Sequence, residues 1–198
     1  MSVRDEIASI LAEPLVTRIN FSLGGLAITG AGLGRVRNAI LHDRIRVVPD
    51  PSLPAGAGGS YNATQNQIGV EPSLTQQHLA SSIQMRSVLL HECSHALVDL
   101  SRAAATTILS DEAAAYLVQL MYRLGRGQSW LRTWASQNQG TPTGRIFHEA
   151  IRIIDRFALL QSCAILQLQA YSALRQAIQQ HPVYRGTSST ALTRADGI

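Results

Sequence analysis

The chain has 198 residues and a formal net charge of +4, and it is long enough to bury a core as one domain. Its basic side chains other than histidine are all arginines, scattered along the sequence, and aromatic residues are few, which argues against a nucleic-acid surface. Two cysteines exclude a disulfide framework, and neither a signal peptide nor a membrane span is evident. We expect one domain over residues 1–185, a disordered tail over 186–198, and a cytoplasmic protein or one secreted without a signal peptide.

The N-terminal part is expected to supply one helix and a small sheet. Apolar residues at a helical period predict an amphipathic helix over 3–19, with Pro14 as a break. The glycine-rich stretch 23–34 has GxGxG spacing and no acidic ribose ligand after it, so we interpret it as a flexible surface loop. Residues 44–48 predict a strand, and 61–70 predict a hairpin or edge strand. Such an edge could hydrogen-bond an extended substrate backbone, or it could be an ordinary sheet edge.

The rest of the chain is expected to be helical. An uninterrupted apolar run predicts a helix over 82–101, and the next helix begins with Ser110 or Asp111 as its N-cap. Apolar periodicity predicts further helices over 143–161 and 164–180. The fold class is therefore α+β and predominantly helical, with a small N-terminal mixed sheet packed on the helix over 82–101.

That helix carries the sequence His91-Glu92-Cys93-Ser94-His95. Residues four apart lie one above the other on a helix, roughly 6 Å apart. His91 and His95 can therefore bind one metal ion while Glu92 projects toward a metal-bound water. Two surface histidines that fall in register by accident are the alternative, but the apolar flanks and the downstream acid favour a site. Cys93 points away from the ligands and is expected to pack inside the protein.

A zinc ion held by two histidines needs a third protein ligand and an open position for water. Glu112 fits best, because a helix–turn–helix hairpin would bring it back beside His95. Asp111 is the competing ligand, less favoured because it is expected to cap its helix. Glu92 would then act as general base, and Asp99 would orient a histidine or make a surface hydrogen bond. The reaction also needs a second stabilising group, for which the candidates are Tyr116, His148, Tyr61, Tyr122 and Arg145.

These residues resemble the gluzincin metallopeptidases, the thermolysin-like clan. The stretch from His91 to Asp99 is similar to the clan's His-Glu-Leu-Thr-His-Ala-Val-Thr-Asp, and Asp111-Glu112-Ala113-Ala114-Ala115-Tyr116 is similar to its Asn-Glu-Ala-Ile-Ser-Asp. The resemblance covers about residues 85–120. It implies zinc bound by His91, His95 and Glu112, with Glu92 as general base, in a zincin-like fold with a short mixed sheet on the active helix. Tyr116 stands where the clan has an aspartate, and His148 and His181 are available for the clan's downstream histidine.

We therefore expect a small zinc-dependent endopeptidase of a bacterial effector or toxin type, acting on a peptide or protein and without nucleic-acid or membrane partners. One alternative is a binding or regulatory module on a zincin scaffold, with a structural or catalytically idle zinc. Another is a metal-dependent amidase acting on a cell-wall peptide. Specificity depends on loops and pocket shape, so the sequence does not predict the substrate.

Overall fold

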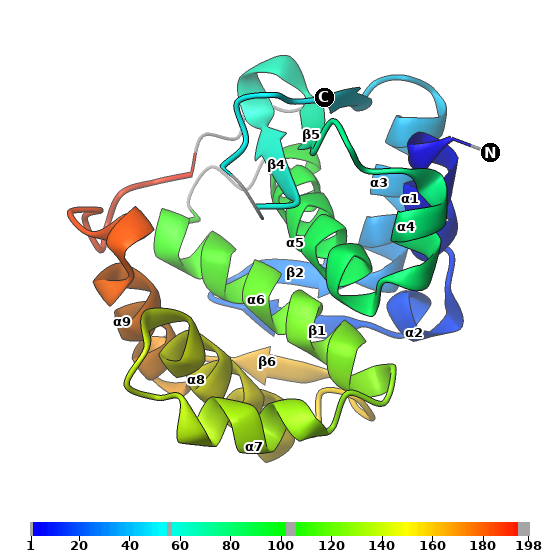
Figure 1. Ribbon diagram of the computed structural model, residues 1–198. Coiled ribbons are helices and arrows are strands. Elements are labelled where there is room, and N and C mark those ends of the chain that lie inside the picture. The colour runs from blue at the N-terminus through cyan, green and yellow to red at the C-terminus, as the bar shows by residue number, and fades with distance from the viewer. Residues whose placement is uncertain (1, 55–56, 102–105, 194–198) are drawn as a thin grey trace.

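The computed structural model describes residues 2–54, 57–101 and 106–193. It has the expected α+β fold, in which helices predominate and short strands form two mixed sheets (Figure 1). In chain order the elements, with η for a 3-10 helix, are α1 (Val3–Ile10), α2 (Pro14–Thr17), β1 (Asn20–Leu23), β2 (Leu26–Thr29), α3 (Gly30–Leu41), β3 (Arg46–Pro49), β4 (Gly59–Asn62), η1 (Ala63–Gln65), β5 (Gln67–Val70), α4 (Gln76–Ser81), α5 (Ile83–Leu100), α6 (Ile108–Gly125), α7 (Trp130–Gln137), α8 (Pro142–Arg156), β6 (Ala164–Leu166), η2 (Leu168–Tyr171), α9 (Ser172–Gln180) and η3 (Pro182–Tyr184).

The two sheets have the strand orders β2-β1-β6 and β3-β5-β4. In the second sheet β5 is central, parallel to β3 and antiparallel to β4. This leaves β4 as an edge strand, and it packs on α5. The predicted strand over 44–48 and the predicted hairpin over 61–70 are thus confirmed as β3 and the β4–β5 pair, and this sheet is the expected one on the helix. The first sheet was not expected, and it recruits β6 from the C-terminal part.

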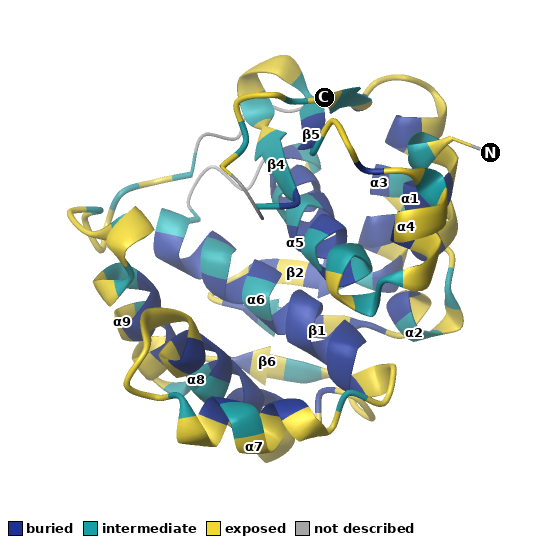
Figure 2. Cartoon of the chain, in the orientation of Figure 1, coloured by how far each residue is buried: buried dark blue, intermediate teal, exposed yellow. Residues whose placement is uncertain are grey.

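The paired helices α5 and α6 form the centre of the fold (Figure 2). The predicted helix over 82–101 is confirmed, and Ser82 caps it by accepting a hydrogen bond from Met85 N at 3.1 Å. Its apolar side chains are covered on one side by α3 and on another by α6. Cys93 is fully buried among them, as expected for a packing residue. Burial of each leucine here contributes about 1.5–3 kcal/mol. No helix in the described part is both long and apolar enough to cross a bilayer.

The glycine-rich stretch 23–34 is not a flexible loop, so that prediction was wrong. Gly24 and Gly25 have φ angles of 59° and 90° and form the turn between β1 and β2. Gly30 opens α3, and a side chain there would overlap the backbone carbonyl of Thr17. Glycine is therefore needed here for positive φ angles and for close approach of the backbone. Composition alone does not distinguish these two requirements from flexibility.

The predicted break at Pro14 is confirmed: the stretch 3–19 forms two helices, and Pro14 begins α2 in the first-turn position that proline favours. Two other boundaries differ from the prediction. The helix expected over 143–161 ends at Arg156 as α8. The helix expected over 164–180 is β6, a 3-10 turn and α9, since its first residues pair with β1. The short helix α7 was not predicted.

The tail expected to be disordered is partly attached to the fold. Ile108 N donates to Ala191 O at 2.8 Å, and Thr193 N donates to Thr106 O at 2.8 Å. These bonds pair the tail with the residues at the start of α6, so the prediction was wrong for residues 186–193. Residues 194–198 lie outside the described part of the chain.

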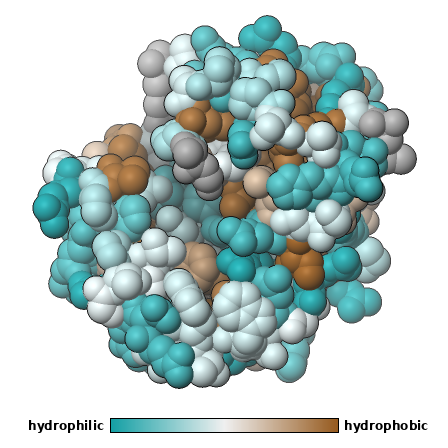
Figure 3. Space-filling model, in the orientation of Figure 1, coloured by the Kyte–Doolittle hydropathy of each residue, from teal (hydrophilic) through white to brown (hydrophobic). Residues whose placement is uncertain are grey.

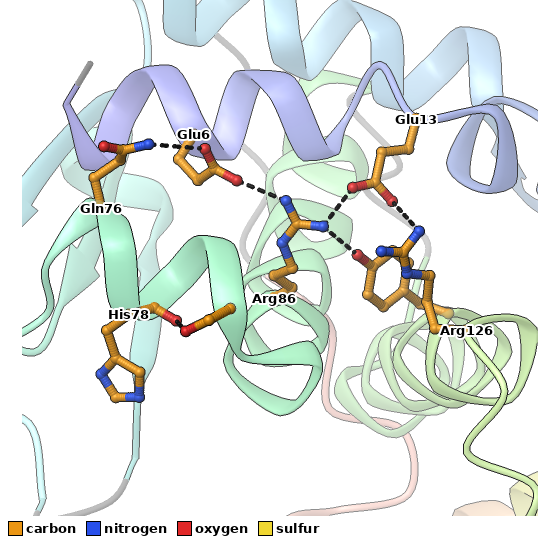
Figure 4. Close-up of polar contacts among 8 residues, drawn as sticks. Glu6, Glu13, Gln76, His78, Arg86 and Arg126 are labelled. Atoms are coloured by element: carbon orange, nitrogen blue, oxygen red, sulfur yellow. Dashed lines mark hydrogen bonds and ion pairs between the residues drawn. The ribbon is translucent and has the colours of Figure 1, made fainter.

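A buried cluster of charges ties the N-terminal helices to α5 and α6 (Figure 4). Arg86, in the first turn of α5, donates hydrogen bonds of 2.6 Å to both Glu6 and Glu13. It also donates to the Tyr122 hydroxyl of α6 at 3.1 Å. Tyr122 is fully buried and is not among the residues that line the cleft described below. It therefore has a structural contact in place of the catalytic one considered from the sequence.

Candidate metal centre

The pairing of α5 with α6 brings three potential metal donors together. His91, His95 and Glu112 each offer one ligand atom, and these atoms lie within 4.8 Å of one another. His91 Nε2 is 3.4 Å from Glu112 Oε2, and His95 Nε2 is 3.7 Å from Glu112 Oε1. Donors about 2.0–2.1 Å from a tetrahedral zinc ion lie about 3.3 Å apart. The spacing of the three side chains therefore suits one metal ion.

The donor set also contains a buried oxygen that needs a partner. Glu112 Oε2 is enclosed and accepts no hydrogen bond from any described residue. A buried carboxylate oxygen without a partner is costly. A cation bound between Glu112 and the two imidazoles would remove that cost, so the residues present fit a metal ion.

Asp111 orients His95. Its Oδ1 lies 2.8 Å from His95 Nδ1, which directs His95 Nε2 toward Glu112. The prediction that Ser110 or Asp111 caps α6 was wrong: Thr107 is the cap, and its Oγ1 accepts from Ser110 N at 3.3 Å. Asp111 thus lies in the first turn of α6 and contacts a metal donor instead of capping the helix.

His91 is held differently. Its Nδ1 is buried and has no hydrogen-bond partner among the described residues. The ring packs edge-on against Tyr116, with 4.8 Å between centroids and 80° between planes. Tyr116 therefore fixes the imidazole by contact. Asp99 is buried and accepts a 2.7 Å hydrogen bond from the Tyr61 hydroxyl, so the predicted surface hydrogen bond was wrong.

The charges of the donors are mutually stabilised. Burial alone lowers the pKa of His95, but the Asp111 and Glu112 carboxylates outweigh it and raise that pKa to about 10. Burial raises the pKa of Glu112, but His95, His91 and Tyr184 lower it to about 2. Without a metal, the carboxylate is therefore ionised and His95 carries a proton at neutral pH. A metal ion would replace that proton.

This exchange predicts how metal binding depends on pH. Only the neutral imidazole binds a metal, so the proton on His95 competes with the metal below about pH 10. We expect zinc affinity to rise with pH between about pH 6 and 9, with release of about one proton per ion. Asp111→Asn should reduce this release, because it removes a carboxylate that raises the pKa of His95, and should weaken binding about 10–100-fold. Calorimetry in buffers of different ionisation enthalpy measures both quantities, and an affinity independent of pH would contradict the expectation. The matched control is Asp155→Asn, an exposed acid paired with Arg132.

A cleft of about 610 Å³ opens on two of the donors, His91 and Glu112, whereas His95 and Glu112 line a smaller cavity of about 200 Å³. The cleft is lined by β4, by the facing sides of α5 and α6, by the start of α8 and by η3. Figure 3 shows the surface hollowed between the lobe that carries β4 and the lobe that carries α7 and α8. A larger cleft of about 830 Å³ lies between α2, the start of α3 and residues 159–163, and the described residues that line it include no comparable group of donors. The cleft of about 610 Å³ is therefore the candidate active site.

Glu92 and the edge strand meet in this cleft. Glu92 lines it beside His91, half-buried. A side chain added at Gly59 would lie 3.3 Å from Glu92 Cγ and 2.9 Å from Leu89 Cδ2. Glycine at this position thus allows β4 to pass directly over the turn of α5 that bears Glu92. The candidate base is thus brought close to a strand edge that pairs with no other described strand.

The other candidates from the sequence fall into two groups. Tyr61 and Tyr116 line the cleft, as do His181 and Tyr184. Neither His148 nor Arg145 is among the residues lining the cleft, although both lie on α8. Sequence reasoning missed Tyr184, which no motif marks and which reaches the cleft from the 3-10 turn η3.

The Tyr184 hydroxyl is close to the donor set. Burial raises its pKa, and the neighbouring Glu112 carboxylate and Tyr116 raise it further. The hydroxyl therefore keeps its proton at neutral pH and remains a hydrogen-bond donor inside the cleft.

Comparison with known proteins adds no relative: no protein-family model, curated protein or solved structure matches the chain.

Proposed function

We propose that the protein is a zinc-dependent endopeptidase of the gluzincin type with a zincin-like fold. The observation that carries this proposal is the convergence of His91, His95 and Glu112, of which His91 and Glu112 line a cleft together with Glu92. Two imidazoles and one carboxylate are a ligand set that suits catalytic zinc and leaves a coordination position open. The unpaired edge of β4 supports a peptide substrate, since an extended chain can add to such an edge by backbone hydrogen bonds.

The roles of the residues follow from their places in the cleft. When bound, zinc supplies a Lewis acid that lowers the pKa of water to about 7 and polarises the scissile carbonyl. Glu92 takes the proton of the attacking water and delivers it to the leaving amine. Asp111 keeps His95 in the orientation that its role as a ligand requires. The peptide lies along β4, which holds its backbone beside Glu92.

A second group must donate a hydrogen bond to the carbonyl oxygen as negative charge develops on it. Tyr184 suits this role better than His148, because its protonated hydroxyl is inside the cleft. Tyr184→Phe should lower kcat about 10²-fold, with little change in KM and no loss of zinc. Steady-state kinetics with metal analysis measure this effect. His148→Ala is the matched comparison and should retain activity. A larger loss in His148→Ala than in Tyr184→Phe would reverse the assignment.

The proposal is tested on the unmodified protein. We expect about one zinc ion per chain by elemental analysis, and internal cleavage of peptides in a mixed library detected by mass spectrometry. Removal of the metal with a chelator should abolish cleavage, and added zinc should restore it. Zinc without cleavage of any peptide would favour a binding module, whereas cleavage restricted to cell-wall peptides would favour the amidase.

A further inference from the structure

The cleft-facing side of α6 continues beyond the metal donors. Glu112, Tyr116 and Gln119 line the cleft, and Arg123 follows on the same face, since these positions are spaced by four, three and four residues. A helix rises about 1.5 Å per residue, so Gln119 lies about 10 Å and Arg123 about 16 Å along the axis from Glu112. The side chains at this end are therefore about three to five residues of extended peptide away from the metal donors.

Arg123 is a buried cation without a counter-charge. Its side chain is only 7% exposed, and its guanidinium carbon lies 5.8 Å from the ring centroids of Trp130 and Phe147. The Nε atom donates to Gln128 Oε1 at 2.8 Å. No carboxylate of a described residue pairs with it, whereas the buried Arg86 has two such partners. Burial lowers the pKa of Arg123 with no opposing carboxylate. A buried arginine is normally paired, so this positive charge can still bind an anion.

Gln119 offers a second polar group at the same end. It is 7% exposed and lines the cleft. Its amide makes no hydrogen bond with another described residue, and neither of its polar atoms is a buried atom that lacks a partner, so the amide is accessible to a ligand in the cleft. Thr143 lines the cleft opposite, in the first turn of the 15-residue helix α8, where the helix dipole is positive. Phe147 on α8 connects Arg123 with the cleft, because its ring lines the cleft and also contacts the Arg123 guanidinium.

We propose that this end of the cleft, formed by Gln119 and the first turn of α8 with the Arg123 guanidinium packed against the lining residue Phe147, is a subsite that binds a carboxylate of the substrate. The proposal rests on the proposed function, because it assumes that a peptide occupies the cleft. Among the described residues that line the cleft, only Glu92 and Glu112 are acidic, and both belong to the metal end. An incoming carboxylate would therefore meet an amide and a positive helix end, with the Arg123 charge against the cleft wall at Phe147. It could be the C-terminus of a short peptide or an acidic side chain within a longer one.

The test measures binding of peptides that are not hydrolysed. The Glu92→Gln protein with zinc is titrated in a calorimeter with N-acetylated alanine peptides of increasing length. Each is used as the free acid, as the C-terminal amide, and as the amide with glutamate in the last position. We expect the free acid to bind about tenfold more tightly than the amide at the matching length. Recovery of this gain by the glutamate amide would assign the subsite to acidic side chains; its absence would assign it to a chain terminus.

Variants locate the effect. In the Glu92→Gln background, Arg123→Gln should abolish the difference between acid and amide and leave amide affinity unchanged, whereas Arg123→Lys should retain part of it. Gln119→Leu should reduce the difference in affinity between the free acid and the amide, and it leaves the charge of Arg123 in place. Arg152→Gln is the matched control, since this arginine lies on α8 with its side chain 62% exposed, and it should behave as the parent protein does.

The outcomes separate this inference from the proposed function. Equal affinity for acid, amide and glutamate peptides at every length would overturn the subsite and leave the peptidase standing. Carboxylate-dependent binding, in a protein whose unmodified form hydrolyses no peptide, would support the subsite and overturn the peptidase. Failure of every peptide to bind would overturn both.

Discussion

Glu92→Gln is expected to leave the zinc content unchanged and to slow peptide hydrolysis about 10³-fold. Glutamine has nearly the same shape as glutamate, but its amide cannot accept the proton of the attacking water. Glu92 is not one of the three converging donors, so the metal should stay in place. Elemental analysis gives the zinc content, and mass spectrometry of a peptide digest gives the rate.

Glu112→Gln is the matched comparison for this change. It makes the same chemical substitution on the facing helix, but it removes the negative charge from between His91 and His95. We expect loss of both zinc and hydrolysis. The two roles would be refuted if Glu92→Gln hydrolysed peptides at the normal rate, or if Glu112→Gln retained full zinc and Glu92→Gln did not.

Arg86→Met is expected to cost about 3–5 kcal/mol of folding free energy, because it leaves the carboxylates of Glu6 and Glu13 with only a 3.4 Å hydrogen bond from Gln76 and a 4.0 Å contact with Arg126. Their side chains are only 7% and 18% exposed, and each accepts a 2.6 Å hydrogen bond from Arg86. Methionine replaces the length of the arginine but none of its charge. Urea denaturation followed by circular dichroism measures the change in the free energy of unfolding.

An exposed pair provides the control. Arg132 and Asp155 also form a two-bond ion pair, but their side chains are 41% and 46% exposed, so Arg132→Met should cost at most about 1 kcal/mol. Adding Glu6→Gln and Glu13→Gln to Arg86→Met should recover part of the loss, because neutral amides are cheaper to bury than unpaired charges. Equal losses in the two single variants would show that the buried cluster is not a major source of stability.

The donor set could be predicted because its geometry is local. His91 and His95 are one helical turn apart, which fixes their relation wherever the helix lies. The prediction for Glu112 required one further assumption, that the next helix folds back on the first. The close packing of α5 on α6 agrees with this assumption. Ordinary sequence patterns therefore contain most of the information about this part of the site.

The supporting residues could not be predicted, because their positions depend on contacts distant in sequence. Four residues around the start of α6 can cap a helix, and only the folded structure shows that Thr107 does so and that Asp111 faces His95. Tyr184 reaches the cleft through the packing of α9 on α6 and α8. No periodicity marks a residue whose place is fixed in this way.

The parallel pairing of β1 with β6 has a consequence for the order of folding. Phe21 lies opposite Ala164, so this contact closes a loop that contains most of the chain, and the loss of chain entropy must come before the strands gain their hydrogen bonds. The α5–α6 hairpin closes a much shorter loop. We therefore expect the donor pair of helices to form early and the three-residue strand β6 to dock late. Amide hydrogen exchange should accordingly be slowest in the helices that bear His91 and Glu112 and fastest at the strand that joins the two ends of the fold.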